Sequence, residues 1–489
     1  MKKKIVFFSL LSVFMLITVG CQNSKDNTDP ENTSVTGLND SEKINKFVVN
    51  CVESMYLWES ETDWTKYNNK NTFSTYSDHF TLFDKFIYKD DAWSMLTENI
   101  ASIKEEFSGV TTTYGYDLIF FRFSNDNSYF AIVMFNYPGS PSERAGLKRG
   151  DIILAINGNK ITESNYIDLF YSSSISIKTG RLEEQHIVEN PGSISMSAKE
   201  MYLDPINKTS IIVKGDHKIG YLCYTDYVNT SEKDLYSVFA DFKNKGVTDV
   251  VLDLRYNGGG HAQTAQRISS VLAPSSVVKG KNVYLSHKWN DLWTSLQDAE
   301  DLNIYFDPTL PVNMDLKKLY VLTSENSASA SEATIIGLKP YLELTLIGET
   351  TSGKYCGGYL LSPEDYYEMF PEKGINKSYY SNFINWGMYI MIYRYSNKNG
   401  YPSFISGIPP DIQISEDYFD LKPFGDEADP LLGQAIEEIT GVKYVKPYSS
   451  TKNVIQYKIV PEMSQKRVWD DRLVDKDAFM NYKRKLINR

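Results

Sequence analysis

Cysteine and histidine are scarce in this chain of 489 residues, which holds four of the first and five of the second. The histidines and carboxylates show no spacing typical of a metal site, so we expect neither a metal nor a cofactor. The glycines at 258–260 are not followed by Lys-Ser/Thr, which argues against a phosphate-binding loop. The formal net charge of −11 argues against nucleic acid as a partner. The chain also lacks internal repeats.

The cysteines do not form a disulfide framework. Three follow residue 21, namely Cys51, Cys223 and Cys356, so at most one disulfide can form among them. A chain of this length buries a core large enough to need none. Cys51 and Cys223 lie on apolar patterns and are expected in the core. Cys356 has no histidine in its segment to activate it, which argues against a thiol mechanism.

Long hydrophobic runs are absent after residue 20, so we expect no spanning helix. Residues 1–20 have a short basic start and an apolar run of signal-peptide length. The run ends at Thr18-Val19-Gly20-Cys21, which resembles a bacterial lipobox, although Thr18 departs from the usual aliphatic residue. We therefore predict lipidation of Cys21, a polar tether over 21–38 and a membrane-anchored protein of the cell envelope. Ordinary secretion with an incidental cysteine is the alternative.

The next segment predicts a small helical region over 39–107. Asn39 with Glu42 is a helix-start signal, and an apolar stripe follows it from residue 44 to 58. A second helix is predicted over 91–107. Such stripes are typical of core-facing helices, and we expect nothing catalytic in them.

Residues 108–205 change to short alternating strands, at 118–123 and 129–135. The run Pro138–Gly158 resembles a PDZ domain, with its short helix, Gly-Asp turn and strand ending in Asn-Gly. A PDZ groove pairs an extended peptide with a strand edge and binds its carboxylate with backbone N–H groups. We place that carboxylate-binding turn at Tyr114-Gly115-Tyr116. The alternative is a rigid spacer that binds nothing.

Residues 206–440 alternate strands with helices, which predicts a parallel sheet with right-handed crossovers. The expected elements are strands at 249–254, 319–323 and 344–347, with helices at 264–272, 332–341 and 430–439. Residues 441–489 are expected to pack back on this core. The chain as a whole is therefore predicted to be a multidomain α/β protein.

Ser329 and Lys354 stand out because each follows a predicted strand and they are 25 residues apart. A hydroxyl is a poor nucleophile until a base takes its proton, and a desolvated amine can be that base. Each residue also has a simpler explanation. Ser329 with Glu332 forms a capping box at a helix start, and Lys354 alone resembles a solvated loop lysine.

The two together carry a family resemblance. The run Ser327–Glu332, with Lys354 25 residues after its middle serine, resembles the carboxyl-terminal processing (tail-specific) serine peptidases. The runs Val251–Gly260 and Gly407–Ile412 are similar to other elements of that family and stand in family order. The resemblance implies a ClpP/crotonase-like spiral core. It further implies a lipoprotein from a Gram-negative bacterium that cleaves polypeptides near their C-termini.

The same resemblance implies the roles of the residues. Ser329 would be the nucleophile of an acyl-enzyme mechanism and Lys354 its base. Gly259 and Ala330 would hold the oxyanion, with Gly258 as the second choice within the glycine turn.

Two departures from the family pattern limit the prediction to a dyad. Relatives often carry Gln where this chain has Gly358, and some carry an acidic residue where it has Pro340. His261 is an alternative base, since it directly follows the glycines. The competing function is a non-catalytic envelope lipoprotein with a degenerate peptidase fold, in which the PDZ-like domain binds the ligand.

Overall fold

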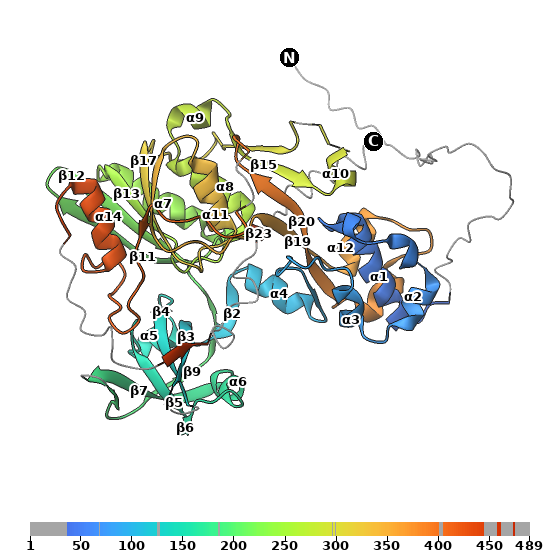
Figure 1. Cartoon of the computed structure of the whole chain (residues 1–489), viewed down its shortest axis with the longest axis horizontal. Helices are drawn as coiled ribbons and strands as arrows, with labels where there is room; N and C mark the ends of the chain where they lie inside the picture. Colours follow the sequence, from blue (N-terminus) through green and yellow to red (C-terminus); the bar gives the residue numbers. More distant parts are fainter. Residues whose placement is uncertain are drawn as a thin grey trace, which may run out of the picture. The chain divides into compact units, whose positions relative to one another are not determined.

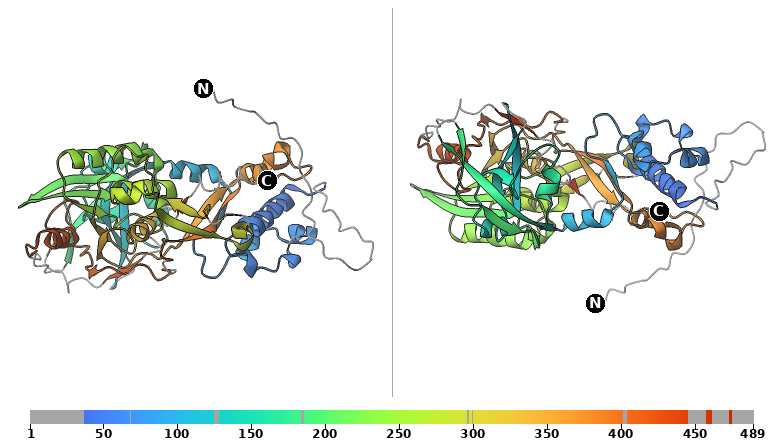
Figure 2. Two further views of the ribbon diagram at one scale, coloured as in Figure 1. Left: turned by 90° about the horizontal axis from the view of Figure 1, so that it is seen from above. Right: turned by 90° about the horizontal axis from the view of Figure 1, so that it is seen from below.

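The computed structural model describes most of the chain after residue 36. The described ranges are 37–67, 69–124, 128–183, 186–295, 297–298, 300–400, 404–444, 457–460 and 473–474. Residues 38–489 belong to one unit, whose elements are drawn in Figures 1 and 2. The predicted signal peptide, Cys21 and nearly all of the tether lie outside the described residues. Within the described part, every helix is too short or too polar to cross a bilayer.

The N-terminal region begins with α1 (Asp40–Met55). Asn39 Oδ1 accepts a hydrogen bond from the Glu42 N–H at 3.0 Å, and the Glu42 carboxylate accepts one from the Asn39 N–H at 2.8 Å. This is the capping box that the sequence predicts. Shorter helices follow: η1 (Glu59–Glu61), η2 (Trp64–Lys66), α2 (Lys70–Thr75) and α3 (His79–Asp84).

The helix predicted over 91–107 is wrong in its first half. Asp91 Oδ1 accepts hydrogen bonds from the N–H groups of Trp93 and Ser94, both at 2.9 Å, and these bonds fold the backbone into a turn. Strand β1 (Met95–Thr97) then pairs antiparallel with β20 (Gly387–Ser396), 290 residues further on. Only α4 (Ile100–Phe107) is helical. Pairing with the distant strand β20 thus decides the structure of residues 95–97, against the helical pattern of the local sequence.

The predicted strands 118–123 and 129–135 lie within β3 and β4 of a mixed β-rich domain. Its sheet has the order β22-β3-β4-β5-β7-β8, with β6 on β5 and β9 on β7. Strand β22 comes from the predicted tail and pairs with β3. The bounds are β2 (Val110–Thr113), β3 (Tyr116–Phe123), β4 (Tyr129–Asn136), α5 (Pro141–Arg144), β5 (Ile152–Ile156), β6 (Asn159–Lys160), α6 (Tyr166–Phe170), β7 (Ser174–Glu183), β8 (His186–Glu189), β9 (Ile194–Ser197), β10 (Lys199–Tyr202) and β22 (Tyr457–Ile459).

The predicted parallel sheet has the order β11-β12-β13-β17-β18-β21, with only β11 antiparallel to its neighbour. Leu431 and Leu432 of α14 pack on one face of it, against Tyr221 and Val251. The predicted strands and helices of this region match observed ones to within three residues. The bounds are β11 (Ile206–Lys214), β12 (His217–Tyr224), η3 (Asn229–Ser231), α7 (Glu232–Asn244), β13 (Asp249–Asp253), α8 (Ala262–Leu272), β17 (Lys318–Thr323), α11 (Ala330–Leu338), β18 (Glu343–Gly348), β21 (Ile412–Gln413) and α14 (Pro430–Thr440).

A second sheet lies beside the first and has the order β14-β23-β19-β20-β15-β16, with β1 added on β20. Strand β23 (Leu473–Val474) again comes from the predicted tail. The remaining bounds are β14 (Gly260–His261), α9 (Ser275–Lys279), β15 (Val283–Trp289), α10 (Asp291–Ser295), β16 (Asn303–Tyr305), β19 (Cys356–Leu361), α12 (Pro363–Met369), α13 (Lys377–Tyr380), η4 (Ser381–Phe383) and β23 (Leu473–Val474).

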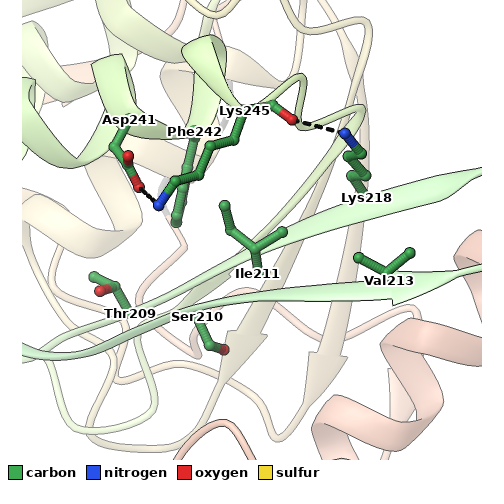
Figure 3. Close-up of a pocket in the computed structure, with 8 residues that line it drawn as sticks. All are labelled: Thr209, Ser210, Ile211, Val213, Lys218, Asp241, Phe242 and Lys245. Atoms are coloured by element: carbon green, nitrogen blue, oxygen red, sulfur yellow. Dashed lines mark hydrogen bonds and ion pairs between the residues drawn. The ribbon is translucent and has the colours of Figure 1, made fainter.

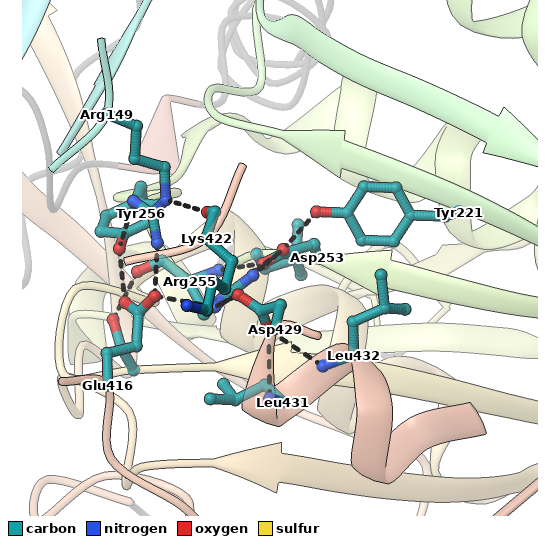
Figure 4. A network of polar contacts seen from close by, with 12 residues as sticks. Arg149, Tyr221, Asp253, Arg255, Tyr256, Glu416, Lys422, Asp429, Leu431 and Leu432 are labelled. Carbon is teal, nitrogen blue, oxygen red and sulfur yellow. Dashed lines mark hydrogen bonds and ion pairs between the residues drawn. The ribbon is translucent and has the colours of Figure 1, made fainter. Parts of the chain in front are cut away.

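A buried charge network closes the end of β13 (Figure 4). The Arg255 guanidinium donates to Asp253 at 2.7 Å, to Glu416 at 2.8 Å and to Asp429 at 2.9 Å. Arg149, from the β-rich domain, forms an ion pair with the same Glu416. Burial alone would raise the pKa of Asp253, but the adjacent Arg255 holds it below its usual value. The network therefore depends on Arg255 to keep Asp253 ionised.

Candidate active site

Ser329 occupies a strained position at the start of α11. Its φ is +57° and its ψ is −109°, a backbone conformation that residues other than glycine rarely adopt. Such a conformation costs about 1–3 kcal/mol and persists only where neighbours enforce it. The side chain is fully buried, and its hydroxyl makes no hydrogen bond within the described residues. The turn thus presents a hydroxyl that the fold itself does not use.

The serines around the nucleophile hold this turn against the glycine turn after β13. Ser327 Oγ donates to the Leu254 carbonyl at 2.8 Å, and Ser331 Oγ donates to the Asn257 carbonyl at 2.9 Å. The Ala328 N–H donates to the same Asn257 carbonyl at 3.1 Å. Both acceptors follow β13, 73 and 74 residues earlier in the chain, so these hydroxyl groups join two turns that are distant in the sequence. The serine-rich sequence therefore fixes where the strained turn lies.

The lysine turn is held in the same way. The Ser352 N–H donates to the Ser327 carbonyl at 3.0 Å, which joins the two turns directly. Thr351 Oγ1 accepts from the Ile408 N–H at 2.8 Å, so the Gly407–Ile412 motif packs on the lysine turn. A Cβ at Gly353, where φ is +95°, would lie 2.3 Å from the Ile405 carbonyl oxygen, so only glycine fits there.

Glu332 joins Ser329 to Lys354. Its Oε2 accepts from the Ser329 N–H at 2.8 Å and from the Lys354 N–H at 2.9 Å. Its Oε1 accepts from Thr351 Oγ1 at 2.6 Å and from the Gly353 N–H at 2.7 Å. Burial raises the pKa of the Glu332 carboxyl to about 8, and these hydrogen bonds oppose that rise.

A second bridge joins the carbonyl groups of the pair. The Tyr395 hydroxyl lies 3.0 Å from the Ser329 carbonyl oxygen and 2.7 Å from that of Lys354. Because one carboxylate oxygen contacts both backbone nitrogens and one hydroxyl contacts both carbonyls, the two residues must be close neighbours. The structure thus brings together the pair that the sequence predicts.

The Lys354 ammonium group is fully buried among aromatic rings. Its Nζ lies 5.5 Å from the ring centroid of Tyr389 and 5.8 Å from that of Trp93. Trp93 comes from the turn before β1, so the N-terminal region contributes a wall to the site. Burial destabilises an ammonium and favours a neutral amine. Ring faces act in the opposite direction, because they attract the cation.

The glycine turn touches the nucleophile. A Cβ at Gly259 would lie 2.7 Å from the Ser329 Cβ and 3.1 Å from its Oγ. The Gly259 N–H, however, donates to Asn257 Oδ1 at 2.9 Å. Within the described residues the N–H groups of Gly258 and Ala330 donate no hydrogen bond. Of the three predicted oxyanion donors, Ala330 and the second-choice Gly258 are therefore available, while Gly259 is engaged.

Among the residues considered as alternatives, Cys356 is unsuited to nucleophilic chemistry, whereas His261 lies in β14 and its role as a base stays untested. Cys356 starts β19 and is buried, and burial raises the pKa of its thiol, which disfavours the thiolate. No disulfide joins it to Cys51 or Cys223, which are both buried as predicted. The His261 N–H donates to the Tyr227 carbonyl at 2.7 Å. Pro340 lies in the turn after α11.

The carboxylate-binding turn predicted at Tyr114-Gly115-Tyr116 has a structural role. Both tyrosine rings are buried in the domain core and stack on each other at 5.7 Å. The Gly115 N–H donates to Thr113 Oγ1, while the Gly115 carbonyl accepts from the hydroxyl of Ser142 in α5. The central donor of the turn is thus satisfied internally, which argues against its predicted role in peptide binding, and that role stays a prediction.

One hollow elsewhere in the described part of the chain is not a competing candidate site. A pocket of about 440 Å³ lies between β11, β12 and α7, lined by residues that include Lys218, Asp241 and Lys245 (Figure 3). Its charged groups are already engaged, as Lys245 pairs with Asp241 at 2.9 Å and Lys218 donates to the Lys245 carbonyl at 3.0 Å. Among the described residues there is no group of His, Cys, Asp or Glu that could hold a metal.

This geometry places a buried serine at the start of α11 beside a buried lysine two residues before β19. Residues 218–414 match the profile of peptidase family S41, and residues 137–178 match that of the PDZ domain. The chain thus carries a peptidase family S41 region joined to a PDZ domain.

Relatives with known names agree with this assignment. The chain is 28% identical over 220 residues to the carboxy-terminal processing protease CtpA of Bacillus subtilis (strain 168), covering 44% of this chain and 42% of that protein. It is 25% identical over 333 residues to a protein of Staphylococcus aureus (strain MRSA252) assigned as a CtpA-like serine protease, covering 66% and 59%. The chain thus spans about half the length of these curated relatives.

A solved structure supports the fold. A protein of Bacteroides fragilis NCTC 9343, assigned as an S41 protease, superposes with a TM-score of 0.65 at 24% identity, covering 81% of this chain and 97% of that one. The multidomain α/β fold predicted from the sequence is therefore confirmed.

Several residues of the site carry no clear sequence signal. Glu332 is visible only as a helix cap, and Asn257 only as part of a turn. Tyr395, Tyr389 and Trp93 are aromatic residues among many, and they reach the site from other strands and turns. A signal exists for Glu332 alone, because a carboxylate three residues after a candidate nucleophile can reach back to its N–H.

Proposed function

We propose that the chain is a serine endopeptidase that cleaves polypeptides near their C-termini. The observation that carries this proposal is the bridge between Ser329 and Lys354. Both side chains are fully buried, and Glu332 and Tyr395 each contact both backbones. A helix cap would need only the serine, and a solvated lysine would not be buried. The names of the CtpA relatives support the substrate class.

The mechanism follows from these positions. Neutral Lys354 takes the proton of the Ser329 hydroxyl, and Oγ attacks the substrate carbonyl carbon. The N–H groups of Ala330 and of the glycine turn then stabilise the oxyanion, with the N-terminus of α11 adding positive potential. Protonated Lys354 gives its proton to the leaving amine. Water then releases the acyl group and restores the serine.

The test is cleavage of an unfolded polypeptide by the full chain. Ser329→Ala and Lys354→Ala should each abolish turnover, and the double variant should be no slower than either. Lys398→Ala is the matched control, because Lys398 is an exposed lysine over a tyrosine ring at 4.1 Å. Retained activity in Lys354→Ala would overturn the dyad. Binding of peptide without any turnover would favour the non-catalytic alternative.

We also propose that the protein is anchored in the cell envelope through a lipid on Cys21, which supports access to exported polypeptides. A tagged fatty acid should label the wild type and not Cys21→Ser. Equal labelling of both proteins would count against this anchor.

A further inference from the structure

We propose that the segment Leu473–Val474 occupies the substrate groove of the candidate site, and that an extended polypeptide substrate must displace it. The proposal rests on the proposed function. It commits to this one occupant because the structure shows the segment in place, as β23 beside β19 (Figure 1).

The segment forms hydrogen-bonded pairs on both sides. Leu473 is in register with Gly260 of β14 and with Gly357 of β19, and both pairings are parallel. Val474 continues the same register on each side. Strands β14 and β19 are therefore not paired with each other, and one strand width on each side, about 5 Å, separates them from the inserted segment. Without β23 the two facing edges would be left unpaired, which is unfavourable in a buried groove.

Both walls of the groove belong to the catalytic machinery. Gly260 directly follows Gly259, whose Cα hydrogens face Ser329. Strand β19 begins two residues after Lys354. A chain that runs between these strands must pass beside the serine on one side and the lysine on the other. This is the path that a scissile peptide needs.

The walls suit a backbone rather than particular side chains. Three of the residues in register with the segment are glycines, namely Gly260, Gly357 and Gly358. A Cβ on any of them would lie within 2.4 Å of a neighbouring atom, such as the Tyr227 carbonyl oxygen beside Gly260. Pairing through main-chain groups gives affinity with little sequence preference. The ligand class is therefore an unstructured, extended polypeptide.

The segment must weaken substrate binding if it competes. A tethered segment has an effective concentration on the order of millimolar. If the groove is open for about one tenth of the time, the apparent KM is about tenfold higher than in its absence. Loss of the segment should thus lower KM and leave kcat unchanged.

The experiment compares proline and alanine variants of the full chain. Leu473→Pro with Val474→Pro removes two N–H donors, and KM for an unfolded polypeptide should fall about tenfold. Leu473→Ala with Val474→Ala keeps the backbone and should behave as the wild type. Lys458→Pro is the matched control, because β22 is a similar short strand that pairs with β3 and not with the site. An unchanged KM in the proline pair, or an equal fall in the alanine pair or in the control, would overturn the inference.

A second measurement does not depend on activity. In the Ser329→Ala background, the proline pair should speed amide hydrogen exchange in β14 and β19, and added peptide of residues 469–478 should reverse the effect. Exchange that stays slow would overturn the inference while leaving the proposed function intact. Faster exchange, together with an absence of cleavage by the chain that keeps Ser329, would instead retain the groove and refute the peptidase.

A different observation carries a second inference, on the position where relatives often carry Gln. A Cβ at Gly358 would lie 2.4 Å from Met391 Cε and 2.6 Å from the Tyr389 ring, so no side chain fits there. We infer that Tyr389 and Trp93 act as positioning residues for Lys354, stabilising the ammonium that forms when the serine loses its proton. Their ring faces lie 5.5 and 5.8 Å from Nζ.

Other groups around Lys354 also influence its charge. Glu332 on α11 and Cys356 on β19 interact with it or lie beside it, and the Tyr395 hydroxyl contacts its carbonyl. The test must therefore change only the rings. Tyr389→Leu removes a ring face, whereas Tyr389→Phe keeps the face and removes only the hydroxyl.

The readout is the pH dependence of kcat/KM. Without the Tyr389 ring face the Lys354 ammonium is less stable, so the pKa of Lys354 should fall by about one unit. The rising limb of the pH profile of kcat/KM should move to lower pH by the same amount. Tyr389→Phe should leave it unchanged, and Trp93→Leu should move it in the same direction as Tyr389→Leu. Acylation of Lys354 by an amine reagent, followed against pH in Ser329→Ala, gives the same shift without turnover. An unmoved limb in Tyr389→Leu, or an equal shift in Tyr389→Phe, would refute the assignment.

Discussion

Replacement of Glu332 by glutamine tests whether one carboxylate holds the two catalytic turns together. The carboxylate accepts four hydrogen bonds at 2.6–2.9 Å, from three backbone N–H groups and one hydroxyl. A glutamine amide offers one accepting oxygen, and its NH₂ group can only donate. If the NH₂ replaces Oε2, it faces the N–H groups of Ser329 and Lys354. If it replaces Oε1, it can donate to Thr351 and leaves only the Gly353 N–H without an acceptor.

The orientation in which the NH₂ group replaces Oε1 leaves fewer donors without an acceptor, so it determines the expected change in the free energy of unfolding. One buried donor without an acceptor costs about 1–3 kcal/mol. At pH 5 the Glu332 carboxyl is protonated, since its pKa is about 8, but its O–H oxygen can still accept from the Gly353 N–H, which an NH₂ group cannot do. Glu332→Gln should therefore lower the free energy of unfolding by that amount at pH 5, measured by urea denaturation. It should also lower kcat, since small displacements at a reacting centre cost up to about a hundredfold. Glu343→Gln is the control, because Glu343 is an exposed glutamate on β18.

The pH dependence of this difference has a fixed sign. The pKa of Glu332 is raised from 4.5 to about 8 by burial, so the folded state holds its proton more tightly than the unfolded state. The stability it contributes is complete below pH about 4.5 and is lost as the pH rises through about 8. The gap between wild type and Glu332→Gln should therefore narrow between pH 5 and pH 9. A gap that widens, or a fully active and equally stable variant, would refute the reasoning.

Three further predictions concern other groups. Burial lowers the pKa of His287 to about 3, so stability should fall as the pH drops below about 6.5, by about 2 kcal/mol at pH 5; denaturation of His287→Phe should lack this slope. Arg255→Met should cost about 3–5 kcal/mol by thermal or urea unfolding, since it removes the cation paired with the buried Asp253 and Asp429, while Glu416 keeps its ion pair with Arg149; a near-neutral effect would contradict the network. Gly259→Ala should abolish cleavage while the far-ultraviolet circular dichroism stays unchanged, because its Cβ would meet Ser329; an active variant would exclude the close approach.

The sequence predicts the elements around the site well, because each is a short aliphatic run bounded by glycine and serine turns. Strand β17 is predicted at 319–323 and observed at Lys318–Thr323, and α11 is displaced by at most three residues. The pairing of serine with lysine could be predicted only through the family resemblance. No local pattern relates two turns that are 25 residues apart.

The elements that complete the site could not be predicted from local patterns. The 91–107 helix fails because Asp91 binds two backbone N–H groups and β1 finds its partner on β20. Strand β23 is two residues long and is defined only by the strands on either side of it. The hydrogen bond from the Gly115 N–H to Thr113 Oγ1 likewise has no signal in the sequence of the turn at Tyr114–Tyr116. In each case a contact made after folding decides the structure.

From the sequence, Ser329 is either part of a helix cap or a nucleophile. In the structure the two roles are compatible. A capping serine would use its hydroxyl to accept from the helix, and a nucleophile must keep it for the substrate. Here the Glu332 carboxylate accepts from the Ser329 N–H at 2.8 Å, while the Ser329 hydroxyl has no partner within the described residues. The cap is thus formed by the glutamate, and the strained turn keeps the hydroxyl beside Gly259 and the first N–H of α11. The same Ser-x-x-Glu motif that stabilises the helix therefore leaves the serine available for chemistry.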